Sequence, residues 1–330
     1  MITKAQVLHN LGPPEVMRWQ EWEVKPPEPN EVCIKHTAIG VNFADTYHRG
    51  GIAHPWPVPP CPVIIGFEAT GVVEDAGSEV DDFKIGDRVA YAIPPLGSYC
   101  ERRNYPAENL VHLPDGIDEK EVAALLMKGM TAYYLLHRTF RVKPGDTILI
   151  HAAAGGMGLI LCQWAKALGA TIIGTVSTEA KATAAAAAGC HYPVIRGKES
   201  FVSKVKEVTN GEGAAVVYES IGKDTINGSL DSLMPMGMCV AYGHVSGPPD
   251  PIDIITDLGS RGSLFITRPA IMHYMAKRED LLTAARALFA SIEKGIVSAN
   301  LNYEYPLKNA VFAHKAIESG KTLGATILIP

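Results

Sequence analysis

The chain has 330 residues, of which 47% are hydrophobic and 20% are charged, and its formal net charge is -5 at pH 7. This composition is typical of a globular protein with room for two domains. The acidic balance and the scattered Lys and Arg residues argue against a nucleic-acid partner. The sequence shows no signal-peptide pattern and no apolar run long enough to span a membrane, so we expect a cytoplasmic protein.

The first third of the chain is predicted to be rich in antiparallel β-strands. Short apolar runs alternate there with turn residues, at 31–36, 70–75 and 87–91. The proline-laden stretch 54–62 cannot be sheet interior, because proline lacks the backbone N–H donor. We interpret this stretch as a surface loop, which is either a lid or partner-facing edge or an ordinary connection.

From about residue 117 the pattern changes to an alternation of strands and helices. An acidic first turn at 118–121 predicts the start of a helix. Strands and helices then follow one another at 147–151, 157–168, 171–176, 179–188, 200–209, 214–219, 238–243 and 263–267. Such alternation predicts a doubly wound parallel sheet of the Rossmann type.

The C-terminal part is predicted to return to the first domain. A helix at about 278–294 ends at Gly295, and a short β-containing tail covers 325–330. We therefore expect a β-rich domain formed by residues 1–125 and 270–330, and an inserted Rossmann domain formed by residues 126–269. The fold class is thus α/β.

The segment 151–158 is the most informative motif of the chain. It follows the apolar run 147–150 and leads into the helical pattern 159–168, which is the order of strand, glycine turn and helix that a dinucleotide site requires. A pyrophosphate needs backbone N–H groups close at hand, and side chains in the turn would block its approach. The predicted contacts are Gly155, Gly156, Met157 and Gly158.

Neither the cysteines nor the histidines predict a metal site. The six cysteines form no C-x-x-C pair, and we expect them to be small buried residues in a reducing compartment. His48 and His54 are the closest histidine group, and no third ligand accompanies them.

The chain resembles the medium-chain dehydrogenases/reductases, and within them the zinc-free quinone oxidoreductase branch. The matching segments are AIGVNFADTY (38–47), GFEA (66–69), GDRV (86–89), LGSY (96–99), KGMTAYY (128–134), the turn 152–158 and residues 267–269. PPLG (94–97), YGH (242–244) and FITRPA (265–270) are similar to the bacterial 2-haloacrylate reductases. The resemblance implies a GroES-like β-rich catalytic domain beside the Rossmann domain, and a homodimer formed through the Rossmann domain.

The zinc alcohol dehydrogenases of the superfamily use a Cys, a Gly-His-Glu segment and a second Cys as catalytic ligands. Here that segment reads Gly66-Phe67-Glu68, and Asn42 stands at the first ligand position. Without a Lewis acid, oxidation of an alcohol loses its main route to alkoxide stabilisation. We therefore expect no metal, and hydride delivery to an acceptor that is already electron-poor.

The end of the second Rossmann strand predicts NADPH rather than NADH as the cofactor. NAD sites usually carry a carboxylate there, whereas residues 174–178 contain none. Ser177 can donate to a 2′-phosphate, Lys181 can neutralise it, and Arg196 stands where the family has a tyrosine and can form a bidentate contact. Glu179 argues against NADPH, since its carboxylate could reach the ribose 2′-hydroxyl of NADH.

The resemblance implies further cofactor contacts in both domains. They are Asn42, Tyr47, Lys128, Thr131, Tyr134, Tyr242, Phe265, Ile266, Thr267 and Lys321.

The acceptor-side residues are predicted to be Asn42, Asp45 and Tyr47, on one segment between the β-rich core and the cofactor domain. Asn42 can orient the nicotinamide amide or an acceptor carbonyl, and Tyr47 can donate to a developing oxyanion. Asp45 is either catalytic or a turn-stabilising residue.

The sequence leaves three functions open. The first is NADPH-dependent reduction of quinones, and the second is reduction of an activated carbon–carbon double bond, such as that of a 2-haloacrylate or an enone. A carboxylate substrate requires a cation, for which His48, Arg49 and Arg268 are candidates. The third is a nucleotide- or RNA-binding or structural role, against which the acidic charge counts for RNA.

Overall fold

The computed structural model describes residues 1–52 and 60–330, which fall into two compact units. Unit 1 comprises residues 1–130, 274–293 and 298–330, and unit 2 comprises residues 131–273 and 294–297. Most of the predicted proline-rich loop, residues 53–59 with His54, lies outside the described residues.

Unit 1 is rich in β-structure. Its strands are β1 (Ile2–Leu8), β2 (Met17–Glu23), β3 (Glu31–Val41), β4 (Val63–Ile64), β5 (Glu68–Ala76), β6 (Arg88–Tyr91), β7 (Arg102–Pro106), β8 (Val111–His112), β15 (Leu301–Pro306) and β16 (Ala325–Ile329). Its helices are α1 (Phe43–Gly50), α8 (Arg278–Glu293), α9 (Ala310–Glu318) and most of α2 (Glu119–Tyr134).

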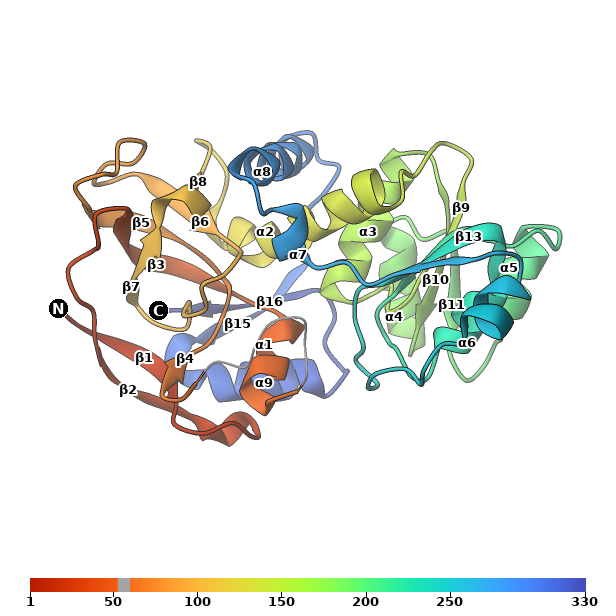
Figure 1. Ribbon diagram of the computed structural model, residues 1–330, viewed down its shortest axis with the longest axis horizontal. Helices are drawn as coiled ribbons and strands as arrows, with labels where there is room; N and C mark the ends of the chain where they lie inside the picture. Colours follow the sequence, from red (N-terminus) through yellow and green to blue (C-terminus); the bar gives the residue numbers. More distant parts are fainter. Residues whose placement is uncertain (53–59) are drawn as a thin grey trace. The chain divides into compact units, whose positions relative to one another are not determined.

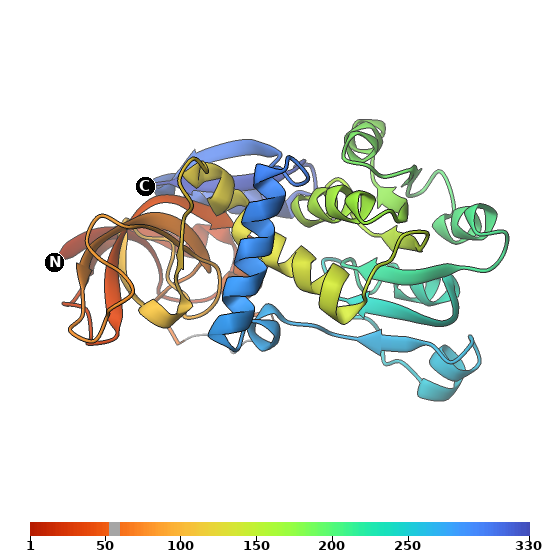
Figure 2. The same ribbon diagram turned by 90° about the horizontal axis from the view of Figure 1, so that it is seen from above.

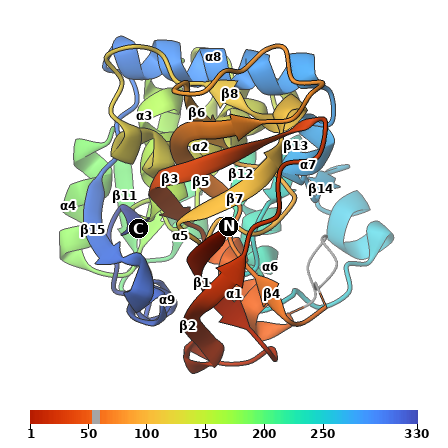
Figure 3. The same cartoon turned by 90° about the vertical axis from the view of Figure 1, so that its left-hand side faces the viewer.

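Two sheets form unit 1. The larger has the order β15-β16-β3-β5-β6-β8, with β7 also paired to β3, and the smaller has the order β2-β1-β4. Figure 3 shows β1, β2 and β4 near α1, and β15 near α9. The C-terminal strand β16 pairs antiparallel with β3, so the predicted return of the tail to the first part of the chain is confirmed.

Small residues let the helices of unit 1 approach their neighbours. Ala123 and Ala124 of α2 pack against Ala38 of β3 and Ile327 of β16. Helix α8 crosses α2 where Gly129 faces the Leu288 side chain, and a Cβ atom at Gly129 would collide with it (Figure 2).

Unit 2 contains a six-stranded sheet with the order β11-β10-β9-β12-β13-β14, in which every pair is parallel. This is the doubly wound order 3-2-1-4-5-6, and it confirms the predicted α/β fold class. The strands are β9 (Thr147–Ile150), β10 (Thr171–Val176), β11 (Tyr192–Ile195), β12 (Ala214–Glu219), β13 (Leu233–Ala241) and β14 (Phe265–Thr267).

Helices cover both faces of this sheet. Figure 1 shows α3 (Gly156–Ala167) and α4 (Glu179–Ala187) on one face, and α5 (Phe201–Val208) and α6 (Ile226–Asp231) on the other. The central strands β9, β10 and β12 are buried on both faces and are accordingly mostly apolar runs rather than alternating ones. The shorter elements include two single turns with π-type hydrogen bonding, Leu135–Thr139 and Ile254–Gly259, and the short helix α7 (Ile271–Tyr274).

The sequence prediction differs from the structure at some element ends. Strand β13 begins at Leu233, five residues before the predicted start. The prediction missed this part because residues 234–237 bulge out between the pairs Leu233–Ala214 and Met238–Val216, with Met236 at a φ of 61°. Helix α1 was not predicted, since its eight residues are mostly polar. Among the described residues, no helix is long and apolar enough to cross a membrane.

Candidate functional site

The glycine turn of unit 2 places residues without side chains at the N-terminus of α3. Gly155 is the N-cap residue, and the helix begins at Gly156. A Cβ atom at Gly158 would come within 2.6 Å of the Ala153 backbone, so only glycine allows the helix to pack this closely on the turn. The free N–H groups of the first helical turn fit an anionic group such as a pyrophosphate.

Two cations gather beside the end of β10. The Arg196 backbone N–H donates to Val176 O at 2.9 Å, which places Arg196 next to the exposed Ser177. Burial lowers the pKa of Lys181, and the nearby positive charge of Arg196 lowers it further. Glu179, the carboxylate that argues against NADPH, forms an exposed ion pair with Lys198, with 2.6 Å between Oε1 and Nζ.

The ends of β13 and β14 carry further predicted residues. Tyr242 follows β13, and its backbone N–H donates to Glu219 O at 2.9 Å. The strand β14 itself consists of the predicted residues Phe265, Ile266 and Thr267. Beyond it, the exposed Arg268 donates to Ala241 O at 2.9 Å, and its Nη2 lies 3.2 Å from His244 Nδ1.

A buried polar cluster in unit 1 surrounds Asn42. Asn42 Nδ2 donates to Glu68 Oε2 at 2.8 Å, and the Met127 backbone N–H donates to Glu68 Oε1 at 2.7 Å. Lys128 Nζ lies 3.6 Å from Glu68 Oε2, which is ion-pair distance. Burial raises the pKa of Glu68, while Lys128 and Asn42 oppose the shift.

Asp45 continues this cluster toward α9. Its Oδ2 atom accepts hydrogen bonds from Asn42 N at 2.8 Å and from the Tyr99 hydroxyl at 3.0 Å. The Tyr99 hydroxyl also lies 2.9 Å from His314 Nε2. Burial raises the pKa of Asp45 to about 7. Asp45 thus stabilises the start of α1, which is the structural one of its two predicted roles.

The side chains of α1 from Thr46 to Arg49 are also buried. Tyr47 is 6% exposed, and its ring packs edge-on against Phe43. Arg49 binds Glu318 through two hydrogen bonds, at 2.6 and 3.1 Å, and contacts His314. Arg49 is therefore already neutralised by a carboxylate, which removes it as a candidate cation for a substrate. The His48 ring is buried and packs against Phe67.

Three other predicted cofactor residues lie elsewhere. Thr131 and Tyr134 belong to the last turn of α2, where Tyr134 is buried and Thr131 is partly exposed. Lys321 is exposed in unit 1, just after α9.

The residues at the zinc-ligand positions do not form a metal site. In the described parts of the chain, no group of three or more His, Cys, Asp or Glu side chains is arranged to hold a metal ion. Asn42 and Glu68 are instead bonded to each other. The six cysteines are free thiols, and all except Cys61 are buried.

Sequence reasoning did not find the partners that hold Asn42 and Asp45 in place. Glu68 was noted only for the missing zinc ligand, and Tyr99 only as part of a matching segment, while His314 was not noted. No local pattern connects residues so far apart in the chain. A usable signal was the presence of Glu68 and His314 in otherwise apolar segments.

Comparison with known proteins identifies the family. The family described as "Alcohol dehydrogenase GroES-like domain" matches residues 28–143, and that described as "Zinc-binding dehydrogenase" matches residues 156–288. A 2-haloacrylate reductase of Burkholderia sp is 51% identical over 99% of this chain and 98% of its own. A quinone oxidoreductase of Pseudomonas aeruginosa is 44% identical over 97% of each chain.

The solved structures agree with the sequence relatives. The crystal structure of Escherichia coli quinone oxidoreductase complexed with NADPH matches with a TM-score of 0.95 and 42% identity, and it covers 100% of both chains. The resemblance inferred from the motifs is thereby confirmed. The chain belongs to the medium-chain dehydrogenase/reductase family of oxidoreductases, together with the bacterial quinone oxidoreductases and 2-haloacrylate reductase.

Proposed function

We propose that this protein is an NADPH-dependent reductase that transfers hydride to quinones without zinc. The observation that carries the proposal is the pair of cations, Lys181 and Arg196, at the end of β10, where an NAD site places a carboxylate. The full-length similarity to quinone oxidoreductases, one of them solved with NADPH, supports the same cofactor and acceptor.

The residues of unit 2 fit NADPH along its length. The glycine turn and the first turn of α3, with Gly155, Gly156, Met157 and Gly158, would hold the pyrophosphate. Ser177, Lys181 and Arg196 would bind the 2′-phosphate. Tyr242, Phe265, Ile266 and Thr267 follow or form the strands whose carboxyl ends line the nicotinamide side of such sites. Thr131, Tyr134, Lys128 and Lys321 remain proposed contacts on the basis of the family.

Unit 1 would supply the groups that act on the acceptor. When bound, NADPH supplies the hydride, and a quinone that takes up this hydride and one proton becomes a hydroquinone. Asn42, whose Nδ2 is held by Glu68, would orient the nicotinamide amide or an acceptor carbonyl by hydrogen bonds. Tyr47 would donate its hydroxyl proton, or a hydrogen bond, to the developing oxyanion.

The second candidate is reduction of a 2-haloacrylate, which the 51% identity to a 2-haloacrylate reductase favours. Hydride would add to the β-carbon of the conjugated double bond and a proton to the α-carbon. The substrate carboxylate requires a cation, and Arg268 with His244 at the ends of β13 and β14 is the remaining candidate pair.

We further propose a cytoplasmic homodimer formed through unit 2. The strand β14 lies at the edge of the six-stranded sheet, and exposed edges invite pairing with a second chain. Phe265 of β14 and the neighbouring segment expose large apolar side chains: Phe265 is 57% exposed, Ile254 75% and Ile255 72%.

The test is anaerobic oxidation of NADPH by the purified protein, with a small ortho-quinone and with 2-chloroacrylate as acceptors. Turnover with the quinone and a lower KM for NADPH than for NADH is the expected result. A preference for 2-chloroacrylate would establish the second candidate instead. Oxidation of neither cofactor with either acceptor would contradict both.

A further inference from the structure

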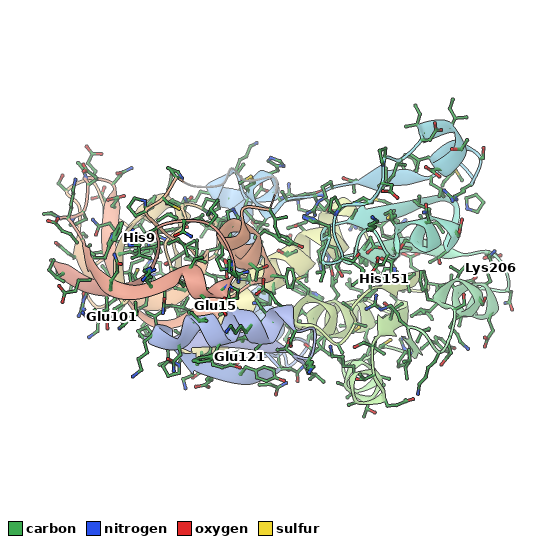
Figure 4. All side chains as sticks on the ribbon, turned by 90° about the horizontal axis from the view of Figure 1, so that it is seen from below. His9, Glu15, Glu101, Glu121, His151 and Lys206 are labelled. Atoms are coloured by element: carbon green, nitrogen blue, oxygen red, sulfur yellow. The ribbon has the colours of Figure 1, made fainter. Side chains whose placement is uncertain are left out.

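A chain of buried polar side chains connects the strands of unit 2. His151, Ser229 and Glu219 are each 0% exposed, and Figure 4 labels His151 inside this unit. His151 Nε2 lies 2.9 Å from Ser229 Oγ, and Ser229 Oγ donates to Glu219 Oε2 at 2.5 Å. At the other side of the ring, His151 Nδ1 lies 2.9 Å from Thr175 Oγ1.

The hydrogen bonds of this chain all run toward Glu219. The Ser229 hydroxyl faces two groups that only accept, Glu219 Oε2 at 2.5 Å and the Thr225 carbonyl oxygen at 2.9 Å. Its single proton is therefore donated to them, most closely to Glu219, and Ser229 accepts from His151 Nε2–H. The imidazole therefore accepts at Nδ1 from the Thr175 hydroxyl. Burial lowers the pKa of His151, which agrees with a neutral ring in one fixed tautomer.

The series of hydrogen bonds ends at Glu219, which holds the loop that follows β12. Glu219 Oε1 accepts from the backbone N–H groups of Ile221 and Gly222, at 2.6 and 3.0 Å. The Thr225 hydroxyl donates to Glu219 Oε2 at 2.9 Å. Backbone groups, hydroxyls and a buried ring thus surround one carboxylate, and the loop that follows β12 takes its shape from it.

The connected residues stand at the carboxyl ends of successive strands. His151 opens the glycine turn after β9, Thr175 is the last residue but one of β10, and Glu219 ends β12. The loop after β12 in turn holds the segment after β13, since Ile221 O accepts from Ser246 N at 2.8 Å. In doubly wound sheets these are the loops that contact a dinucleotide.

We propose that His151, Ser229 and Glu219 are positioning residues for the bound dinucleotide, and that they act by fixing the loops after β9, β10 and β12. This inference rests on the proposed function, because it takes a nicotinamide dinucleotide as the cofactor. A network that holds loops common to both cofactors strengthens the binding of NADPH and NADH equally. Lys181 and Arg196, by contrast, act on the 2′-phosphate and therefore on NADPH alone.

The decisive variant is Ser229→Ala, which removes the hydroxyl that bridges His151 and Glu219 and leaves both of them in place, with 3.5 Å between Nε2 and Oε2. The matched control is Ser232→Ala in the same helix region, because the Ser232 side chain is equally buried and donates to Gly228 O at 2.7 Å, outside the network. The readouts are the Kd of NADPH and of NADH by fluorescence titration, and kcat with a quinone at saturating NADPH.

Ser229→Ala is expected to raise both Kd values about tenfold, because loops that the network no longer fixes must be ordered when the cofactor binds, while kcat changes less than about twofold. Ser232→Ala should match the wild type, and Ser229→Thr, which restores a hydroxyl, should recover most of the affinity. If Ser229→Ala does not fold, Thr175→Val tests the other end of the chain with the same readouts.

Two results would overturn the inference. Unchanged Kd values in Ser229→Ala, together with a lower Tm, would show that the network only stabilises the fold. A higher Kd for NADPH alone would show that the network acts on the 2′-phosphate site. If the wild-type protein binds neither nucleotide, the proposed function itself fails, and this outcome is distinct from both of the others.

Discussion

Asn42 is bound through its side-chain amide to the buried carboxylate of Glu68, with 2.8 Å between Nδ2 and Oε2. The same carboxylate lies 3.6 Å from Lys128 Nζ. Glu68 therefore orients Asn42 and neutralises Lys128 at once. Asn42, which stands where the zinc alcohol dehydrogenases have their first ligand, is thus held in place by a hydrogen bond to a carboxylate.

We expect Glu68→Gln to destabilise the protein strongly. The change leaves the Lys128 ammonium buried without a counter-charge, which costs about 3 kcal/mol or more for a buried pair. Thermal unfolding should show a Tm lower by roughly 6 °C or more. The double variant Glu68→Gln/Lys128→Met should recover a large part of this loss, and a double variant as unstable as the single one would contradict the pairing.

Lys181→Ala is expected to weaken the binding of NADPH selectively. Loss of a charge-assisted hydrogen bond to the 2′-phosphate should raise the KM for NADPH about tenfold and that for NADH less than about twofold. Lys198→Ala is the control, because Lys198 pairs with Glu179 on the surface. Equal effects of Lys181→Ala on the two cofactors would contradict the proposed 2′-phosphate site.

Tyr47→Phe tests the proposed proton or hydrogen-bond donor. If the hydroxyl acts in the transition state, kcat and kcat/KM for the quinone should both fall, by about ten- to a hundredfold. The KM for NADPH should change little, and the Tm should stay close to that of the wild type because the ring remains in its buried position. Unchanged kcat and kcat/KM would reduce Tyr47 to a packing residue.

The raised pKa of Asp45 predicts that the stability of the protein depends on pH. Its pKa is raised by burial from 3.8 to about 7, so the folded state binds more protons than the unfolded state between these values. Wild-type stability that depends on this carboxyl is therefore lost as the pH rises from about 4 to about 7. The neutral isostere Asp45→Asn removes this loss, so its Tm should rise relative to the wild type between pH 5 and pH 8.

The comparison with Asp45→Asn is needed because other buried groups titrate in the opposite sense. Burial lowers the pKa of His36 and of His314 to about 3, so each adds stability as the pH rises from about 3 to 6.5. Both contributions are common to the wild type and the variant. A Tm difference that stays constant from pH 5 to pH 8 would show that Asp45 does not titrate in this range.

The Rossmann unit was predictable from sequence because its signals are local. The strand β9, the glycine turn and α3 are contiguous, and each carries its own pattern of residues. The Asn42–Glu68 and Tyr99–His314 contacts were not predictable, because they join residues 26 and 215 positions apart. Local patterns carry no information about such pairs, which the packing of the sheets and α9 brings together. The cations Lys181 and Arg196 lie between these extremes, because the resemblance to the family, and not a local pattern, assigned Arg196 to the same 2′-phosphate site as Lys181.

The most direct test of the central claim is a kinetic isotope experiment with NADPH deuterated at the transferred position of C4. The anaerobic reduction of an ortho-quinone is followed in single turnovers, with and without a metal chelator. We predict slower turnover with the deuterated cofactor and the same rate in the presence of the chelator. Loss of activity on chelation, or no turnover of NADPH with the quinone, would contradict zinc-free hydride transfer.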